Sequence, residues 1–167
     1  GMGAPDMPPV HMIGATADMT TAMMLAYGIV TALLCVERTG VGQELHVSML
    51  APRLWIQSNN ILFTLLNGRP RPRQSRTAAP NPLVNQYRCQ DDKWILLSHY
   101  TPERYWPPFC RAMSLERLQQ DPRFQDSRAR RENSEALIAI IDSAFAARTR
   151  EEWMRVLEEG GLIVSPI

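Results

Sequence analysis

The sequence predicts an α/β fold, which takes an α+β form within these 167 residues. An uncharged run at 19–36 repeats its apolar side chains at helical spacings of three and four. Two short segments further along, 84–89 and 94–99, flank a polar turn, which is typical of a β-hairpin. Helical periodicity then returns up to the end of the chain. We therefore expect a helix-strand-helix unit at 1–66, a linker rich in arginine and proline at 67–83, and a small α/β domain at 84–167.

The uncharged run is expected to be a helix that other parts of the protein cover on nearly every side. Asp18 immediately precedes it, where unpaired backbone N–H groups and the helix dipole favour an anion. A carboxylate in this place is either a helix N-cap or a nucleophile or base, and the residues alone leave both interpretations open. The apolar positions form two faces, which are Met19, Met23, Ala26, Val30 and Leu33 on one side and Leu25, Ile29, Ala32 and Val36 on the other.

The rest of the first piece follows from turn and strand signals. Three prolines at 4–9 predict an extended lead-in. Gly40 fits a helix C-cap position, and the alternation of Glu44–Met49 predicts a strand. Pro52 suits the first turn of a second helix, in which Trp55 is expected to be a buried anchor and which ends at Asn67–Gly68.

The small domain is predicted to continue from its hairpin into helices. Pro102–Met113 is the first of them, and Pro107 and Pro108 should kink or restart it. A short piece follows from Leu115. The later signals are a turn at 121–124, a helix capped by Asn133 or Ser134, a capping box of Thr149 with Glu152, and a stop at Gly160–Gly161.

Composition excludes several classes of function. Hydrophobic content of 45% and charged content of 21% are typical of a soluble globular chain, and a net charge of +1 gives no general attraction to nucleic acid or acidic lipid. The cysteines and the histidines are widely spaced, which disfavours a disulfide framework or a metal site and favours a reducing cytoplasm. Threonines, a tyrosine and a glycine dilute the apolar run, so a membrane span is disfavoured, and no signal peptide is recognised.

Several motifs, taken in order, resemble one family. The central stretch contains ADMTT at 17–21, YGI at 27–29, ALL at 32–34 and ERTGVGQ at 37–43, followed by LHVSML at 45–50. The small domain adds the hairpin at 87–95, DPRF at 121–124, REN at 131–133, the 148–153 segment and VSPI at 164–167. Together these motifs resemble the class III (CaiB/BaiF) CoA-transferases over nearly the whole chain. The resemblance implies that 1–66 is a middle piece of the large, Rossmann-like domain of that family.

The resemblance implies a function for Asp18. In that family the aspartate at this position is acylated by the substrate and then carries CoA as a thioester. The resemblance further implies acyl-CoA and carboxylate substrates, no prosthetic group, and an interlocked homodimer or larger oligomer. Cytoplasmic localisation fits this implied chemistry. No CoA-binding residue is assigned.

The sequence also departs from the family pattern. The N-terminal half and the C-terminal return segment of family members are not represented, and Gly68 is the only glycine between Asn67 and Val84, where a glycine-rich loop is often found. A partial chain could have a second chain as its partner, and by itself it is expected to be inactive.

Alternatives therefore remain. One is an α-methylacyl-CoA racemase that uses Asp18 as acid and base, although Met19–Ala22 is more like the transferases. Another is a non-catalytic truncated or split-gene product that persists as an oligomer. The arginines at 69, 71, 73 and 76 either meet the phosphates of an acyl-CoA or of RNA, or keep a linker solvated; aromatic residues that would stack on bases are missing there.

Overall fold

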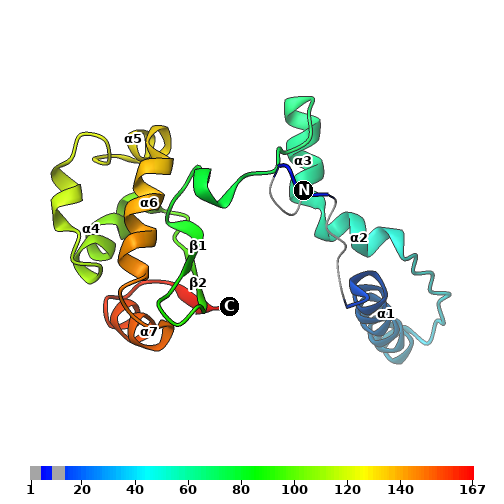
Figure 1. Ribbon diagram of the computed structural model, residues 1–167. Helices are drawn as coiled ribbons and strands as arrows, with labels where there is room; N and C mark the ends of the chain where they lie inside the picture. Colours follow the sequence, from blue (N-terminus) through cyan, green and yellow to red (C-terminus); the bar gives the residue numbers. More distant parts are fainter. Residues whose placement is uncertain (1–4, 9–13) are drawn as a thin grey trace. The chain divides into compact units, whose positions relative to one another are not determined.

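A computed structural model describes residues 5–8 and 14–167 and divides the chain into two units, Gly1–Arg73 and Gln74–Ile167 (Figure 1). The boundary between the units falls inside the predicted linker 67–83. The proline-rich lead-in at 4–9 and His11 lie partly or wholly outside the described residues.

The first unit is dominated by the long helix α1 (Thr16–Thr39). Its predicted C-cap is confirmed, because Gly40 has a φ of 71° and its N–H donates to the Val36 carbonyl. The expectation of nearly complete coverage is wrong within this chain. No residue of α1 is buried, and Met23 and Tyr27 are 71% and 72% exposed. The reason is that few elements of this unit pack against the helix.

The covered side of α1 meets two other parts of the unit. Helix α2 (Leu50–Ile56) packs against it, and the side chain of Leu45 lies on Gly28. A Cβ at Gly28 would stand 2.9 Å from both Leu45 methyl carbons, so glycine permits this close approach. By length and composition alone α1 could also cross a membrane, a criterion that core helices of soluble proteins meet as well.

Residues 44–49, predicted to be a strand, are not one. The described part of the first unit contains no strand, and 41–48 runs as an irregular segment between α1 and α2. A strand is stabilised by backbone hydrogen bonds to a neighbouring strand, so alternation of side chains alone cannot produce one.

The second predicted helix is divided into α2 and α3 (Ser58–Asn67). The division falls at Gln57, whose N–H still bonds to the Arg53 carbonyl, so the chain departs only briefly from a helical path. The predicted end is confirmed, with Gly68 at a φ of 65°. Trp55 is not a buried anchor, since it is 78% exposed, whereas Pro52 is buried.

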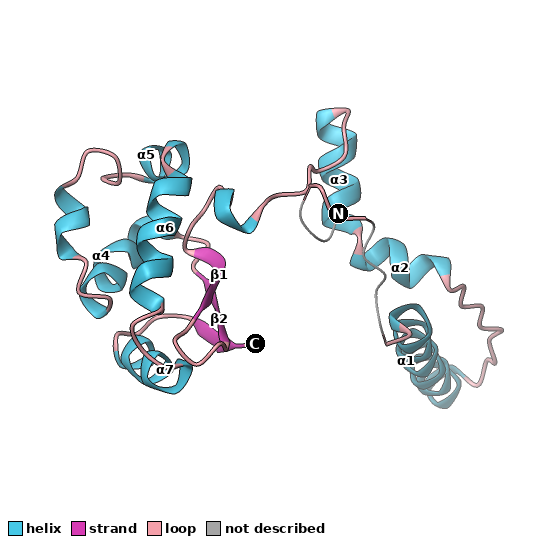
Figure 2. Cartoon of the chain, in the orientation of Figure 1, coloured by secondary structure: helices cyan, strands magenta, loops and turns pink. Residues whose placement is uncertain are grey.

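The second unit contains the sheet (Figure 2). The predicted hairpin is confirmed as β1 (Val84–Arg88) antiparallel to β2 (Trp94–Ser98). A third strand, β3 (Val164–Pro166), pairs with the other edge of β2 and was not predicted. Three residues that include a proline are too short to show a strand period.

Helices cover this sheet and form the rest of the unit. They are α4 (Pro102–Ala112), α5 (Ser127–Glu132), α6 (Ser134–Phe145) and α7 (Arg150–Glu159), with short 3₁₀ turns at Arg76–Ala78 and Glu116–Gln120. Of the kink or restart expected at Pro107 and Pro108, the restart is wrong, because α4 runs through both. Burial of Trp106, Phe109 and Cys110 on one face keeps the helix continuous despite the missing N–H groups.

The core of this unit joins the hairpin to α6 and α7. The rings of Tyr87 and Phe145 stack with centroids 5.1 Å apart, and the Trp153 indole N–H donates to the Phe145 carbonyl. The predicted capping box of Thr149 and Glu152 at the start of α7 is confirmed. Asn133 does precede α6, but its side chain donates to the Ala129 carbonyl instead of capping.

Candidate active site

Asp18 is the third residue of α1 and is exposed. The N-cap of the helix is Ala15, in the left-handed region at φ 47° and ψ 41°, and no side chain caps this end. The Asp18 carboxylate makes no hydrogen bond or ion pair with any residue that the structure describes. The N-cap interpretation of Asp18 is therefore wrong, and its carboxylate is available for chemistry.

The backbone around Asp18 is electropositive. The first helical hydrogen bond runs from the Met19 N–H to the Ala15 carbonyl, at 2.9 Å. The N–H groups of the first three residues, Thr16 to Asp18, consequently have no acceptor within the helix. These N–H dipoles are suited to stabilising negative charge that develops beside the first turn.

Arg53, in α2, contacts this first turn of α1. Its guanidinium donates to the Thr16 hydroxyl at 3.2 Å, which ties the second helix to the first turn of α1. Sequence reasoning missed this contact, because no local signal connects residues 37 positions apart.

A small apolar cavity lies between α1 and α2, but Asp18 does not face it. It has a volume of about 140 Å³ and is lined by Thr20, Met23, Met24, Pro52, Trp55 and Ile56. Successive helical residues are about 100° apart, so Thr20 lies about 200° around the helix from Asp18. Asp18 instead shares its face with Leu25 and Ile29, which are 41% and 46% exposed. The covering that we expected around this helix is therefore not provided on the Asp18 face by the described part of the chain.

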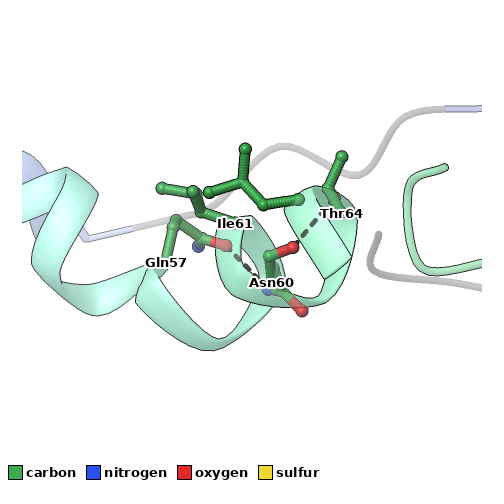
Figure 3. A pocket seen from close by; sticks show the side chains of 5 residues that line it. Gln57, Asn60, Ile61 and Thr64 are labelled. Carbon is green, nitrogen blue, oxygen red and sulfur yellow. Dashed lines mark hydrogen bonds between the residues drawn. The ribbon is translucent and has the colours of Figure 1, made fainter. Parts of the chain in front are cut away.

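A second hollow lies along α3 (Figure 3). It measures about 250 Å³ and is lined by Gln57, Asn60, Ile61, Thr64 and Leu65. The Asn60 amide donates to Gln57 Oε1 at 2.8 Å, and the Thr64 hydroxyl donates to the Asn60 carbonyl at 2.9 Å. Because these polar groups satisfy one another, nothing in the hollow indicates a reactive centre.

The arginines of the linker divide between the units. Arg76 forms two 2.9 Å hydrogen bonds to the Asp142 carboxylate and a further one to the Gln86 carbonyl, so it is a structural anchor of the second unit. In the first unit, Arg71 lies over the Phe63 ring and Arg73 donates to the Met7 carbonyl. No arginine of this segment is directed at Asp18 by a contact that the structure describes.

The comparisons with known proteins agree with this fold. The sequence model of CoA-transferase family III matches residues 1–167, and the chain belongs to that family. It is 28% identical, over 98% of its length, to the probable fatty acyl-CoA transferase Rv3272 of Mycobacterium tuberculosis. It is 27% identical, over 92% of its length, to the (R)-2-hydroxy-4-methylpentanoate CoA-transferase of Clostridioides difficile.

Solved structures show the same fold. A crystal structure of Rv3272 covers 99% of this chain with a TM-score of 0.79 at 27% identity, and a CAIB/BAIF family protein from Brucella suis gives the same score at 22% identity. The chain spans 43% and 38% of the length of the two sequence relatives and 42% of the solved Rv3272 chain. The exposed face of α1 is consistent with this partial coverage.

Proposed function

We propose that this chain supplies the nucleophile of a CoA-transferase that moves CoA from an acyl-CoA to a carboxylic acid. The observation that carries the proposal is the carboxylate of Asp18 in the first turn of α1, exposed and without a partner among the described residues, in a chain of CoA-transferase family III. The substrates are a CoA thioester and a free carboxylate, and the protein residue that reacts is Asp18.

The proposed reaction is a balanced series of acyl transfers. An Asp18 oxygen attacks the acyl-CoA carbonyl carbon, the C–S bond breaks, and CoA leaves as a thiolate. The thiolate then attacks the aspartyl carbonyl of the resulting anhydride, which releases the first carboxylate and leaves an aspartyl-CoA thioester. The acceptor carboxylate reverses both steps, so Asp18 is regenerated and CoA ends on the acceptor. Covalent catalysis of this kind divides one difficult exchange into easier ones.

The backbone supports the charge changes of this series. Each addition puts negative charge on a carbonyl oxygen, and the unpaired N–H groups of the first turn of α1 are suitable donors for such an oxygen. A water-excluding wall would strengthen these interactions. Since Leu25 and Ile29 on the Asp18 face of α1 are exposed, we expect another part of the assembly to supply this wall and the isolated chain to be inactive.

A transferase is preferred to a racemase for a specific reason. The relatives described above carry CoA-transferase names, one acting on (R)-2-hydroxy-4-methylpentanoate and another described as a fatty acyl-CoA transferase. A racemase would use Asp18 to remove and return a proton, and no covalent aspartyl intermediate would form.

Trapping of the intermediate tests the proposal. In an active preparation that contains this chain with the rest of the family fold, acyl-CoA followed by hydroxylamine should convert Asp18 to a hydroxamate, which peptide mass spectrometry locates. Asp18→Asn should abolish both the label and CoA exchange, because an amide is a far poorer nucleophile. Asp6→Asn, also in the first unit, is the matched control and should keep both. Exchange at near wild-type rate by Asp18→Asn would falsify the assignment.

Assembly is part of the proposed function. We expect a dimer or larger species, with the open face of α1 covered by a second copy or by a second chain that supplies the rest of the fold. The support is the exposure of Met19, Val30 and Leu33, which are 62%, 65% and 63% exposed on one helix. Contiguous apolar surface of this kind usually marks an interface. Sedimentation velocity at low micromolar concentration measures the state directly, and a well-behaved monomer would remove this part of the proposal. We expect the assembly to work in the cytoplasm.

A further inference from the structure

His99 follows β2 in the second unit, and its side chain is fully buried. Its backbone is held on both sides. The N–H donates to the Leu83 carbonyl at 2.9 Å, and the carbonyl accepts from the Asn81 amide at 3.1 Å. The imidazole is consequently fixed in the interior of the sheet region.

Among the described residues the ring makes one hydrogen bond, to the segment that leads into the last strand. Nε2 of His99 accepts from the backbone N–H of Ile163 at 3.0 Å, one residue before β3 begins. An accepting Nε2 places the proton of a neutral imidazole on Nδ1. Nδ1 is buried and has no hydrogen-bond partner among the described residues.

Protonation would therefore oppose this arrangement at two places. A proton on Nε2 would point at the Ile163 N–H, turning a hydrogen bond into a contact between two donors. The resulting positive charge would also lie in the interior without a compensating partner, which is costly. The strand can avoid both penalties by leaving the sheet.

We propose that His99 is an acid-sensitive latch, which holds β3 on the sheet while its imidazole is neutral and releases β3 when the imidazole is protonated. Release would make β2 an edge strand, because β3 covers one of its two sides. It would also uncover Leu97 and Leu162, which are buried when the strand is in place. The inference concerns the second unit and does not depend on the chemistry proposed for Asp18.

The neighbouring groups do not replace the missing counter-charge. From α4, the Tyr105 ring faces the imidazole with centroids 4.6 Å apart. Next to it in the sequence, the Arg104 guanidinium lies over the Tyr105 ring, and Glu103 is paired with Arg130 at 2.8 Å. From the β1 side, the Leu83 carbonyl accepts from the His99 backbone N–H, and the 162–164 segment contributes no charged side chain.

The direction of the pH effect follows from linkage. Burial lowers the pKa of His99, and the Leu83 carbonyl only partly opposes this. The released state has an ordinary histidine, so the sheet-bound state binds fewer protons. Opening should thus become more favourable by up to about tenfold per pH unit as the pH falls below about 6.5, and should level off below the folded pKa.

Another contact near the end of β3 involves a titratable group, the Asp91 carboxylate, but this group titrates in a different pH range from His99. Arg150 donates to the Ile167 carbonyl, and the Asp91 carboxylate accepts from the Arg150 backbone N–H. Partial burial works to raise the pKa of Asp91, but hydrogen bonds from Lys93 and Arg150 outweigh it, and the pKa lies below its usual range. Asp91 therefore stays ionised throughout the range in which His99 titrates.

Hydrogen exchange on the 167-residue chain tests the latch. Protection of peptides that cover 160–167 is measured by mass spectrometry between about pH 7.5 and about pH 4.5, with intrinsic exchange rates divided out. We expect protection of this segment to fall at least about tenfold across the range while the core of α6 keeps its protection. Constant protection of 160–167 would overturn the proposal.

Variants separate the histidine from other titrating groups. His99→Gln retains an acceptor that does not titrate, so protection should lose its pH dependence. His99→Phe lacks the acceptor and should show low protection at every pH. The matched control is His46→Gln, at an exposed histidine of the first unit, which should behave as the wild type. An unchanged pH dependence in His99→Gln would also overturn the proposal, and if that variant fails to fold, the loss of protection in the wild type and the His99→Phe result still decide it.

Discussion

At the scale of single residues, the three cysteines occupy different environments. Burial raises the pKa of the Cys89 thiol to about 11, with the nearby Asp91 carboxylate acting in the same direction. Burial likewise raises the pKa of Cys110 to about 12. Cys35, in α1, is only partly buried, and its sulfur accepts from the Gln43 amide. Only a thiolate reacts readily, so these side chains should differ in reactivity.

We predict that native protein at about pH 8 is labelled by a thiol reagent at Cys35 and scarcely at Cys89 or Cys110, because almost none of the two buried thiols is ionised. Mass spectrometry of the labelled peptides measures this. Cys35→Ser should remove the rapid label, and denaturation should make the remaining cysteines reactive. Rapid native labelling of Cys89 would contradict the burial argument.

Asp18 shows how far residue identity determines a site. Its place before an uncharged run indicated a helix N-terminus, and the structure confirms that position. The choice between cap and free carboxylate depended on the backbone at Ala15, whose left-handed conformation no propensity predicts for alanine.

At the scale of elements, α7 depends on its capping box. The Thr149 hydroxyl accepts from the Glu152 N–H, and the Glu152 carboxylate accepts from the Thr149 N–H at 2.9 Å. The Thr149 backbone N–H and then its side chain hold the pKa of Glu152 below its usual range. The carboxylate thus contributes stability above its unfolded pKa and loses that contribution as the pH falls through the lower folded value.

Thr149→Ala should lower the free energy of unfolding by about 1 kcal/mol, because the first turn of α7 loses its side-chain cap. Urea denaturation followed by circular dichroism measures the change. Thr149→Ser keeps the hydroxyl and is the matched control. If alanine and serine variants unfold at the same urea concentration as the wild type, the cap contributes nothing to stability.

The irregular 41–48 segment, unlike α7, has a local sequence pattern that did not predict its structure. Its alternating sequence is suited to a strand, and Leu45 does pack on Gly28, yet the described part of this unit contains no strand to pair with it. A hairpin carries its own partner a few residues away, which is why β1 and β2 were predictable.

At the scale of the whole molecule, burial is concentrated in one unit. Every buried residue among those described lies between Ala79 and Leu162, except for Pro52. The second unit therefore has a core of its own, whereas the first exposes most of its apolar side chains. A unit can fold independently only when its own residues bury enough apolar surface to offset the loss of conformational entropy.

We predict that a polypeptide of residues 74–167 folds alone and unfolds cooperatively in urea, close to the main transition of the full chain. A polypeptide of residues 1–73 should show no cooperative transition, because little of its apolar surface is buried. Circular dichroism and tryptophan fluorescence measure both, since each piece contains tryptophan. Independent cooperative folding of 1–73 would contradict this division.

The sequence by itself determined the local features of this protein. It predicted the positions of α1, the hairpin, the Gly40 and Gly68 helix ends and the α7 capping box. Each of these features depends on residues within about one or two helical turns of one another. Motifs taken in order also identified the family.

Only the tertiary structure decided the features that depend on distant neighbours. It showed β3 on the far side of β2, Arg76 bonded to Asp142, the buried His99 bonded to Ile163, and α1 exposed where nearly complete coverage was expected. Pairing and burial are properties of two surfaces, and a sequence pattern describes only one of them. An apolar face in the sequence indicates that a helix needs a packing partner. Only the three-dimensional packing shows whether this chain provides that partner.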